Sequence, residues 1–228
     1  MPPERVARGR PRSERSRRAI LDAAAKLLTE RGYADITIEG IAAEAGVGKT
    51  TIYRWWSTKA AIYIDLYSEL ASQIVPPPDT GSVERDLTIL VQGAFRLYRD
   101  TAAGLALTGI VAEAQSNAAV STIVRAQFVP SRRHVTLAIL GRAAKRGEIP
   151  ADLNLDVVSE LITGAVWFYL LAGDGALTAR RAGQLVKTIM TGIPTTPSNS
   201  VKEPAKRTAP QSLRRTQSAS NLSSPTRN

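Results

Sequence analysis

Cysteine is absent from this 228-residue chain, and His134 is its one histidine. The absence of cysteine excludes disulfides, thiol nucleophiles and zinc–thiolate sites. A single histidine argues against a histidine-based metal cluster and against Ser–His catalysis. We therefore expect no metal and no cofactor.

Long apolar segments are also missing. The N-terminus has no apolar core of the kind that a secretory signal needs. The longest nearly apolar run, Leu161–Gly173, is shorter than the roughly 20 residues that span a bilayer. The sequence therefore predicts a cytoplasmic protein with no membrane partner.

The net charge of +10 lies at the two ends of the chain. Residues 1–18 contain seven arginines and two glutamates, and residues 194–228 contain six basic residues and one glutamate. The residues between carry as many acidic as basic groups. A neutral body with two basic arms indicates a polyanionic partner. The alternative is that the arms are solvated ends, and the composition favours this alternative for the C-terminal arm.

Apolar residues recur at three- and four-residue steps along most of the chain, which predicts an all-α fold. We find no pair of strands and no internal repeat. The expected helices cover about 13–31, 38–45, 49–56, 58–75, 87–98, 105–114, 120–128, 130–146, 155–172 and 178–191.

Two changes in composition mark boundaries. The triplet Pro76–Pro78 cannot continue a helix, and the chain from Pro194 is rich in Ser, Thr, Pro and Asn with few large apolar residues. We predict a basic disordered arm (1–13), a first folded domain (14–75), a second folded domain (82–193) and a disordered basic tail (194–228).

The stretch "AEAGVGKTT", residues 43–51, allows two interpretations. Gly48, Lys49 and Thr50 resemble the end of a phosphate-binding loop, which would indicate a nucleotide-using enzyme. Such a loop needs a buried strand before it and a long helix after it. The preceding segment has helical spacing, and Ala43 stands where the pattern requires glycine.

The same residues fit the turn of a helix-turn-helix at about 37–56. Ala42, Gly46 and Ile52 supply a small residue, a turn glycine and a branched apolar residue for a tight helix crossing. The second helix then exposes donors suited to base edges and phosphates. These donors are Lys49, Thr50, Tyr53 and Arg54. Trp56 is expected in the core, while Trp55 fits either the core or the DNA surface.

Residues 14 to 73 resemble the N-terminal domain of the TetR-type transcriptional regulators. The resemblance rests on the pattern "ILDAA…LL…RGY…TI..IA..AGV…T.YR…S.KAA". The segment that begins "PSRRHVTLAILGRAAKRGEIP" is similar, more loosely, to the ligand-binding and dimerisation domain of one subgroup. The resemblance implies a three-helix DNA-binding domain, an all-helical ligand domain and a homodimer on an operator.

The resemblance also implies roles for single residues. Thr37 matches a helix-capping position that often meets a phosphate, and Lys59 matches a lysine that commonly holds the DNA backbone. The sequence departs from the family pattern at four positions: Gly48, Thr50, Trp55 and Trp56. These departures affect which operator sequence is recognised, and not the assignment of the domain. The resulting DNA-binding candidates are Arg17, Arg18, Thr37, Gly48, Lys49, Thr50, Thr51, Tyr53, Arg54, Trp55 and Lys59.

The ligand domain offers weaker signals. The helix at 155–172 is apolar nearly all round, which predicts burial on both sides, one of them against a partner subunit. Dimerisation candidates are Val158, Ile162, Ala165, Tyr169, Leu185 and Ile189. Candidates for contact with an unidentified small-molecule effector are Phe95, Tyr98, Phe128, His134, Trp167 and Phe168, each of which also suits plain core packing.

The leading function is a ligand-responsive regulator, a repressor, that binds a palindromic operator as a homodimer. One alternative is a non-specific architectural DNA-binding protein that uses its basic arms. The other alternative is the nucleotide-using enzyme.

Overall fold

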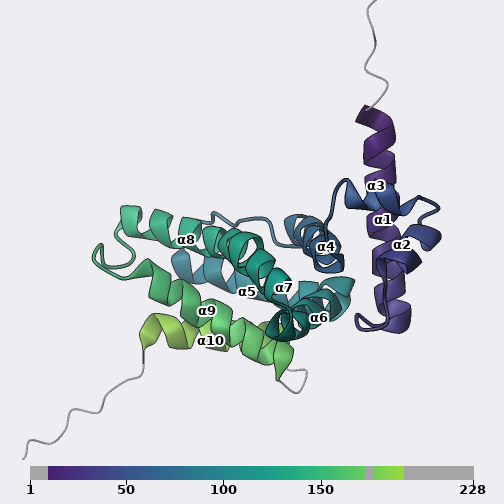
Figure 1. The fold of residues 1–228 in the computed structure, drawn as a ribbon. Coiled ribbons are helices and arrows are strands. Elements are labelled where there is room, and N and C mark those ends of the chain that lie inside the picture. The colour runs from purple at the N-terminus through teal and green to yellow at the C-terminus, as the bar shows by residue number, and fades with distance from the viewer. Residues whose placement is uncertain (1–9, 173–176, 193–228) are drawn as a thin grey trace, which may run out of the picture. The chain divides into compact units, whose positions relative to one another are not determined.

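The computed structural model describes residues 10–172 and 177–192, and each regular element within these ranges is a helix (Figure 1). The α-helices are α1 (Arg10–Arg31), α2 (Ile38–Glu44), α3 (Lys49–Tyr53), α4 (Lys59–Ile74), α5 (Val83–Asp100), α6 (Ala102–Ser116), α7 (Ala118–Ile123), α8 (Val129–Arg146), α9 (Leu155–Leu171) and α10 (Ala179–Thr191). One π-helical turn, η1 (Val124–Phe128), joins α7 to α8. The predicted all-α class is confirmed. None of the described helices is long and apolar enough to cross a membrane.

Helix α1 carries its apolar residues on one buried stripe. Ile20, Ala24 and Leu28 are fully buried at four-residue steps, and the helix ends at Gly32. Gly32 has a φ of +74°, a left-handed conformation that glycine adopts without steric cost. The helix begins at Arg10, so residues 10–13, predicted as part of a disordered arm, are helical. The rest of the predicted arm lies outside the described residues.

Helices α2 and α3 form the expected helix-turn-helix. Thr37 caps α2 by accepting a hydrogen bond from the backbone N–H of Gly40. Gly46 in the turn has a φ of +64°, and the buried side chains of Ala42 and Ile52 lie on either side of that turn. The left-handed glycine and the small Ala42 let the two short helices approach closely.

Helix α5 lies at the centre of the remaining helices and contacts α4, α6, α8, α9 and α10. Leu87, Val91, Phe95 and Tyr98 recur at helical spacing along α5 and are buried. This inward stripe accounts for the strongly amphipathic sequence of the helix.

The segment from α7 to α8 continues as helix through Pro130, which was predicted to open a helix in its first turn. Pro130 does lie in the first turn of α8. Proline lacks an N–H group and clashes with the carbonyl four residues before it. The π-turn η1 ends at Phe128, two residues before Pro130, and includes Ala126, whose carbonyl is the one that a proline at 130 would meet in a regular helix.

Helix α4 packs against helices of both predicted domains. It ends at Ile74, two residues before Pro76, and it packs on α1, α5 and α6. These contacts join the predicted DNA-binding and ligand-binding regions into one compact unit, which ends at Gly192. The predicted C-terminal tail lies outside the described residues.

Candidate nucleic-acid interface and ligand pocket

Helix α3 presents its polar side to solvent. Lys49, Thr50 and Arg54 are exposed, and the Tyr53 side chain is 53% exposed although it is large and aromatic. Ile52 on the opposite side is fully buried and anchors the helix. Thr51, predicted as a contact residue, is half-buried. The exposed face therefore combines two cations, a hydroxyl and an aromatic ring.

Lys49 is paired within the protein. Its Nζ lies 2.7 Å from Oε1 of Glu39, on α2. The hydrogen bond between them raises the pKa of Lys49 and lowers that of Glu39. Both side chains are more than half exposed, so solvent and salt screen the pair. A phosphate can therefore compete with Glu39 for this lysine.

The residues that precede α2 and α3 differ in their chemistry. Thr37 is exposed and caps α2 with its hydroxyl, whereas Gly48 at the start of α3 offers no side chain to cap it. A Cβ added at Gly48 would meet only the Thr50 hydroxyl, at an ordinary contact distance of 3.7 Å. Glycine is therefore not required by packing at this position.

Lys59, predicted to hold the DNA backbone, makes two contacts inside the protein. Its Nζ donates a hydrogen bond to the backbone oxygen of Tyr33, at 2.9 Å, and lies 4.3 Å from the centre of the Tyr33 ring. These contacts hold the start of α4 against the end of α1.

Tyr33 in turn reaches α6. Its hydroxyl donates a hydrogen bond of 2.5 Å to Glu113, and burial followed by this bond raises the pKa of Tyr33. A Cβ added at Gly109 would lie 2.1 Å from the Tyr33 ring, so glycine is required for this close approach. Tyr33, Glu113 and Gly109 thus link the helix-turn-helix region to the ligand domain.

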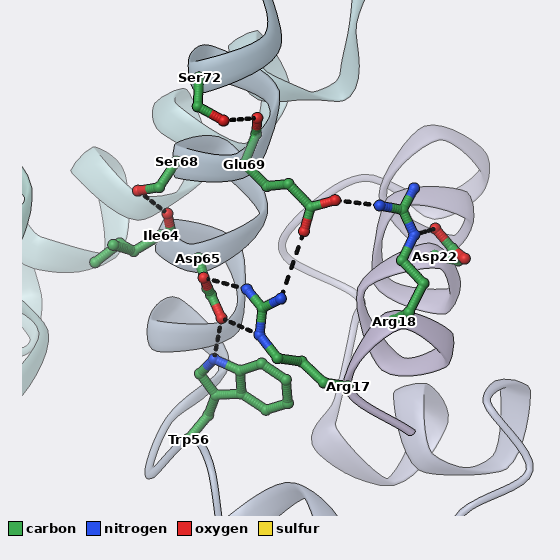
Figure 2. A network of polar contacts seen from close by, with 9 residues as sticks. All are labelled: Arg17, Arg18, Asp22, Trp56, Ile64, Asp65, Ser68, Glu69 and Ser72. Carbon is green, nitrogen blue, oxygen red and sulfur yellow. Dashed lines mark hydrogen bonds and ion pairs between the residues drawn. The ribbon is translucent and has the colours of Figure 1, made fainter. Parts of the chain in front are cut away.

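Arg17, predicted as a DNA contact, is paired within the protein. Its guanidinium donates two hydrogen bonds to Asp65 of α4, at 2.7 and 3.2 Å, and lies 3.7 Å from Glu69 (Figure 2). Arg18, also predicted to contact DNA, pairs with Glu69 and with Asp22. These arginines hold α1 against α4. Arg15, by contrast, is exposed, and no carboxylate pairs with it in the described part of the chain.

Asp65 is the residue of this network that sequence reasoning missed. The indole N–H of Trp56 donates to its carboxylate at 3.2 Å, so Asp65 joins α1, the end of the helix-turn-helix and α4 (Figure 2). Trp56 is 5% exposed, which confirms its predicted core position, while Trp55 is 38% exposed. Asp65 and Glu69 are four residues apart on one helix, and this spacing could have indicated a shared acidic face.

The ligand region contains a pocket between α4, α5, α8 and α9, which we call the inner pocket. Its volume is about 70 Å³. Apolar side chains make up most of its wall, and the polar groups include Arg132, Thr136 and the hydroxyls of Tyr67 and Tyr98. An adjoining outer groove of about 250 Å³ lies between η1, α8 and α9 and shares Arg132, Thr163 and Trp167 with the inner pocket.

Three of the six predicted effector contacts line these two spaces. Tyr98 lines the inner pocket, Phe128 lines the outer groove, and Trp167 lines both. The other three need correction because they lie elsewhere: Phe95 is buried against Tyr169, His134 is exposed, and Phe168 is 61% exposed. Arg132 and Tyr67 were missed, because neither stands out until α4 and α8 are brought together.

The burial of α9 places one predicted dimer contact, Ile162, in the core and leaves the other five partly exposed. Ile162 is 3% exposed and packs in the chain's own core, as do the partly buried Val158 and Tyr169. Ala165 is half-buried, and on α10 Leu185 and Ile189 pack partly against the core. The other side of α9 is apolar and open, since Val157, Leu161, Phe168 and Leu171 are all exposed. This second side is the more exposed of the two, and the dimer face stays a prediction.

The phosphate-loop interpretation fails on local structure. Residues 38–44, which would have to form the preceding strand, are helix α2. The helix after the motif, α3, is only five residues long. Lys49 is paired with Glu39, outside any cradle of backbone N–H groups built by a strand and a long helix.

Comparison with known proteins agrees with this geometry. Residues 20–66 match the family model for bacterial regulatory proteins of the tetR family, and residues 77–189 match the tetracyclin repressor-like C-terminal domain. The chain is 32% identical over 189 residues to the HTH-type transcriptional regulator YdeS of Bacillus subtilis, covering 83% of this chain and 95% of that protein. It is 29% identical over 186 residues to the DNA-binding transcriptional repressor TetR of Mycobacteroides abscessus, covering 81% of this chain and 95% of that protein.

A solved structure, that of the TetR family transcription regulator SCO0332, has the same fold. It aligns with a TM-score of 0.69 at 30% identity, over 79% of this chain and 99% of that one. The matched proteins are DNA-binding regulators and not enzymes, in agreement with the exposed polar face of α3. The chain belongs to the TetR family of transcriptional regulators.

Proposed function

We propose that this regulator is a repressor that binds a palindromic operator as a homodimer and leaves it when a small molecule occupies the ligand region. The observation that carries the proposal is the exposed face of α3. Tyr53 ends this helix and Arg54 follows it directly; both are exposed, and the opposite side of the helix is anchored by the buried Ile52. A large aromatic ring left exposed beside cations suits contact with DNA.

The shortness of α3 supports a dimer. A helix of five residues reaches few base pairs, so two copies related by a two-fold axis double the length of sequence that is read. The open apolar side of α9 suits the interface, because Leu161 and Phe168 are each more than half exposed. Family membership supports the same assembly.

Helix α4 suits the transmission of a ligand signal. It carries Tyr67 in the inner pocket, Asp65 in the network with α1, and Lys59 beside Tyr33. A ligand that moves α4 would therefore move the helix-turn-helix and change the spacing of the two DNA-binding heads. Repression rather than activation is supported by the similarity to the named repressor of Mycobacteroides abscessus.

The test is selection of bound duplexes from a random DNA library, followed by sedimentation of the complex. We expect enrichment of one inverted repeat, bound by two subunits. Enrichment of a single, non-repeated site bound by one subunit would contradict the dimer proposal.

A second candidate, non-specific DNA packaging through the basic arms, would give no enriched sequence and would lose all binding at high salt. Around the helix-turn-helix, Arg17, Arg18 and Lys49 already pair with carboxylates, whereas the exposed face of α3 presents Thr50 and Tyr53, which suit base edges better than phosphates. This arrangement favours the sequence-specific regulator.

A further inference from the structure

The inner pocket contains one polar cluster in an otherwise apolar wall. The hydroxyls of Tyr67 and Tyr98 lie 3.0 Å apart, and Arg132 lies over the Tyr67 ring with its Cζ 5.4 Å from the ring centre. Leu90, Val91 and Trp167 are among the apolar residues around this cluster. The polar groups thus face a space whose wall is otherwise mostly apolar.

The hydrogen bond between Tyr67 and Tyr98 uses only one of their two O–H groups. Two hydroxyls carry two protons, and the single hydrogen bond between them uses one. Burial raises the pKa of both tyrosines, so both keep their protons at neutral pH. One O–H group of the pair therefore remains available to an acceptor in the pocket.

Arg132 has a charge without a carboxylate partner. Within residues 10–172 and 177–192, no Asp or Glu forms an ion pair with it, and its buried Nε atom has no hydrogen-bond acceptor. The buried Nε atoms of Arg133 and Arg142 also lack hydrogen bonds, but both of these guanidinium groups pair with carboxylates. A half-buried cation without a counter-ion is costly unless a ligand neutralises it.

We propose that the ligand of this regulator is an organic anion, with its carboxylate or phosphate head on Arg132 and the Tyr67–Tyr98 pair and a compact apolar body along Trp167. The body would extend from the inner pocket into the outer groove, which share Arg132, Thr163 and Trp167. A guanidinium binds both kinds of head in the same forked geometry. A cationic ligand would be repelled. A neutral one would leave Arg132 without a counter-ion, because its hydrogen bond with Tyr67 supplies no negative charge.

The test uses four probes with one eight-carbon body: octanoate, octyl phosphate, 1-octanol and octylammonium. Binding to the full chain is measured by isothermal titration calorimetry in the absence of DNA. We expect saturable binding of at least one anion. The affinity for 1-octanol should be at least about tenfold lower than for that anion, and the affinity for octylammonium lower still. The better of the two anions identifies the head group.

Arg132→Met keeps an unbranched apolar stem and removes the charge. We therefore expect it to weaken binding of the anion about tenfold and to leave binding of 1-octanol unchanged. Arg132→Lys should restore part of the loss, which guards against a variant that is merely misfolded. Arg125→Met is the matched control, because Arg125 is exposed and lines neither space. A double variant, Tyr67→Phe with Tyr98→Phe, should also weaken binding of the anion, because it removes the O–H group that is available to the head group.

Equal binding of octanoate, octyl phosphate and 1-octanol would overturn the proposal, as would an anion affinity that is unchanged in Arg132→Met. Failure of both anions to bind would overturn it too. The effector role rests on the proposed function, and operator binding is measured separately with and without the bound anion. An anion that binds through Arg132 but leaves operator affinity unchanged would refute the ligand-responsive function and not the ligand class.

Discussion

Arg17 of α1 donates two hydrogen bonds to the carboxylate of Asp65 of α4 and thereby fixes the first helix to the helix that reaches the ligand pocket (Figure 2). The same carboxylate accepts the indole N–H of Trp56, at the end of the helix-turn-helix. One acidic side chain thus connects α1, the end of the helix-turn-helix and α4.

Replacement of Arg17 separates a structural role from a phosphate contact. Arg17→Gln should destabilise the fold by about 1 kcal/mol, because it removes a charge-assisted pair that is partly screened by solvent. It should leave the salt dependence of DNA binding almost unchanged. Arg15→Gln is the matched control, because Arg15 is exposed. We expect it to leave the stability of the fold unchanged and to reduce the slope of log affinity against log salt concentration by about one per subunit. Thermal unfolding and binding titrations over a range of salt measure both. A salt slope that falls in Arg17→Gln would assign that residue to the DNA surface.

Replacement of the exposed α3 side chains should affect recognition and not folding. Tyr53→Ala and Arg54→Ala each remove a side chain that is exposed in the free protein. We expect each to cost about 1–3 kcal/mol per half-site on the selected operator, and about twice that on a palindrome whose half-sites act independently. Footprinting and circular dichroism measure the two effects. Unchanged sequence preference in the double variant would remove α3 from the recognition role.

A charge introduced on α9 should affect assembly on the exposed side of the helix and folding on the buried side. Leu161→Glu places the charge on the exposed side, so we expect the proposed dimer to dissociate while each subunit stays folded. Ile162→Glu buries an unpaired charge in the core and should unfold the chain. Sedimentation and circular dichroism distinguish these outcomes. A Leu161→Glu variant that remains dimeric would place the interface elsewhere.

The contact of Glu148 with the start of α5 should make stability depend on pH. The backbone N–H of Val83 donates to Glu148 at 2.6 Å, and this bond, followed by the Arg146 side chain, lowers the pKa of Glu148 below its ordinary value of 4.5. A carboxyl group with a lowered folded-state pKa stabilises the fold above its ordinary pKa, and this contribution disappears as the pH falls through the folded-state pKa. Glu148→Gln should therefore lower the melting temperature at about pH 7, and the difference from the parent chain should shrink below about pH 4. A difference that persists at acid pH would show that the carboxylate charge is not its cause.

An added methyl group at Gly109 should loosen the link between the two regions. Gly109→Ala places its Cβ within the volume of the Tyr33 ring, so the ring must move away from Lys59 and Glu113. We expect a loss of stability of about 1–3 kcal/mol from this overpacking. Gly141→Ala, where the added Cβ meets nothing within 4 Å, is the control and should be nearly neutral or slightly stabilising. Equal melting temperatures for the two variants would contradict the close approach of Tyr33 to α6.

The sequence by itself determined the helices and the helix-turn-helix. Apolar residues at three- and four-residue steps predicted the helices, because burial of one face is a local property that repeats along the chain. The tight crossing of α2 and α3 was also predictable from a local pattern, because Ala42, Gly46 and Ile52 stand within eleven residues of one another. Local chemistry was also sufficient for the Thr37 cap and for the core position of Trp56.

Only the tertiary structure decided which charges are free and which face of α9 is open. Arg17 and Asp65 are 48 residues apart in the sequence, so no local pattern could show that they pair. Helix α9 is apolar on both sides, and only its packing shows that Ile162 faces the core while Leu161 faces outward. The cluster of Arg132 with Tyr67 and Tyr98 likewise forms only when α4, α5 and α8 meet. Partners in each case come from segments far apart in the chain, and their contacts depend on how the helices pack.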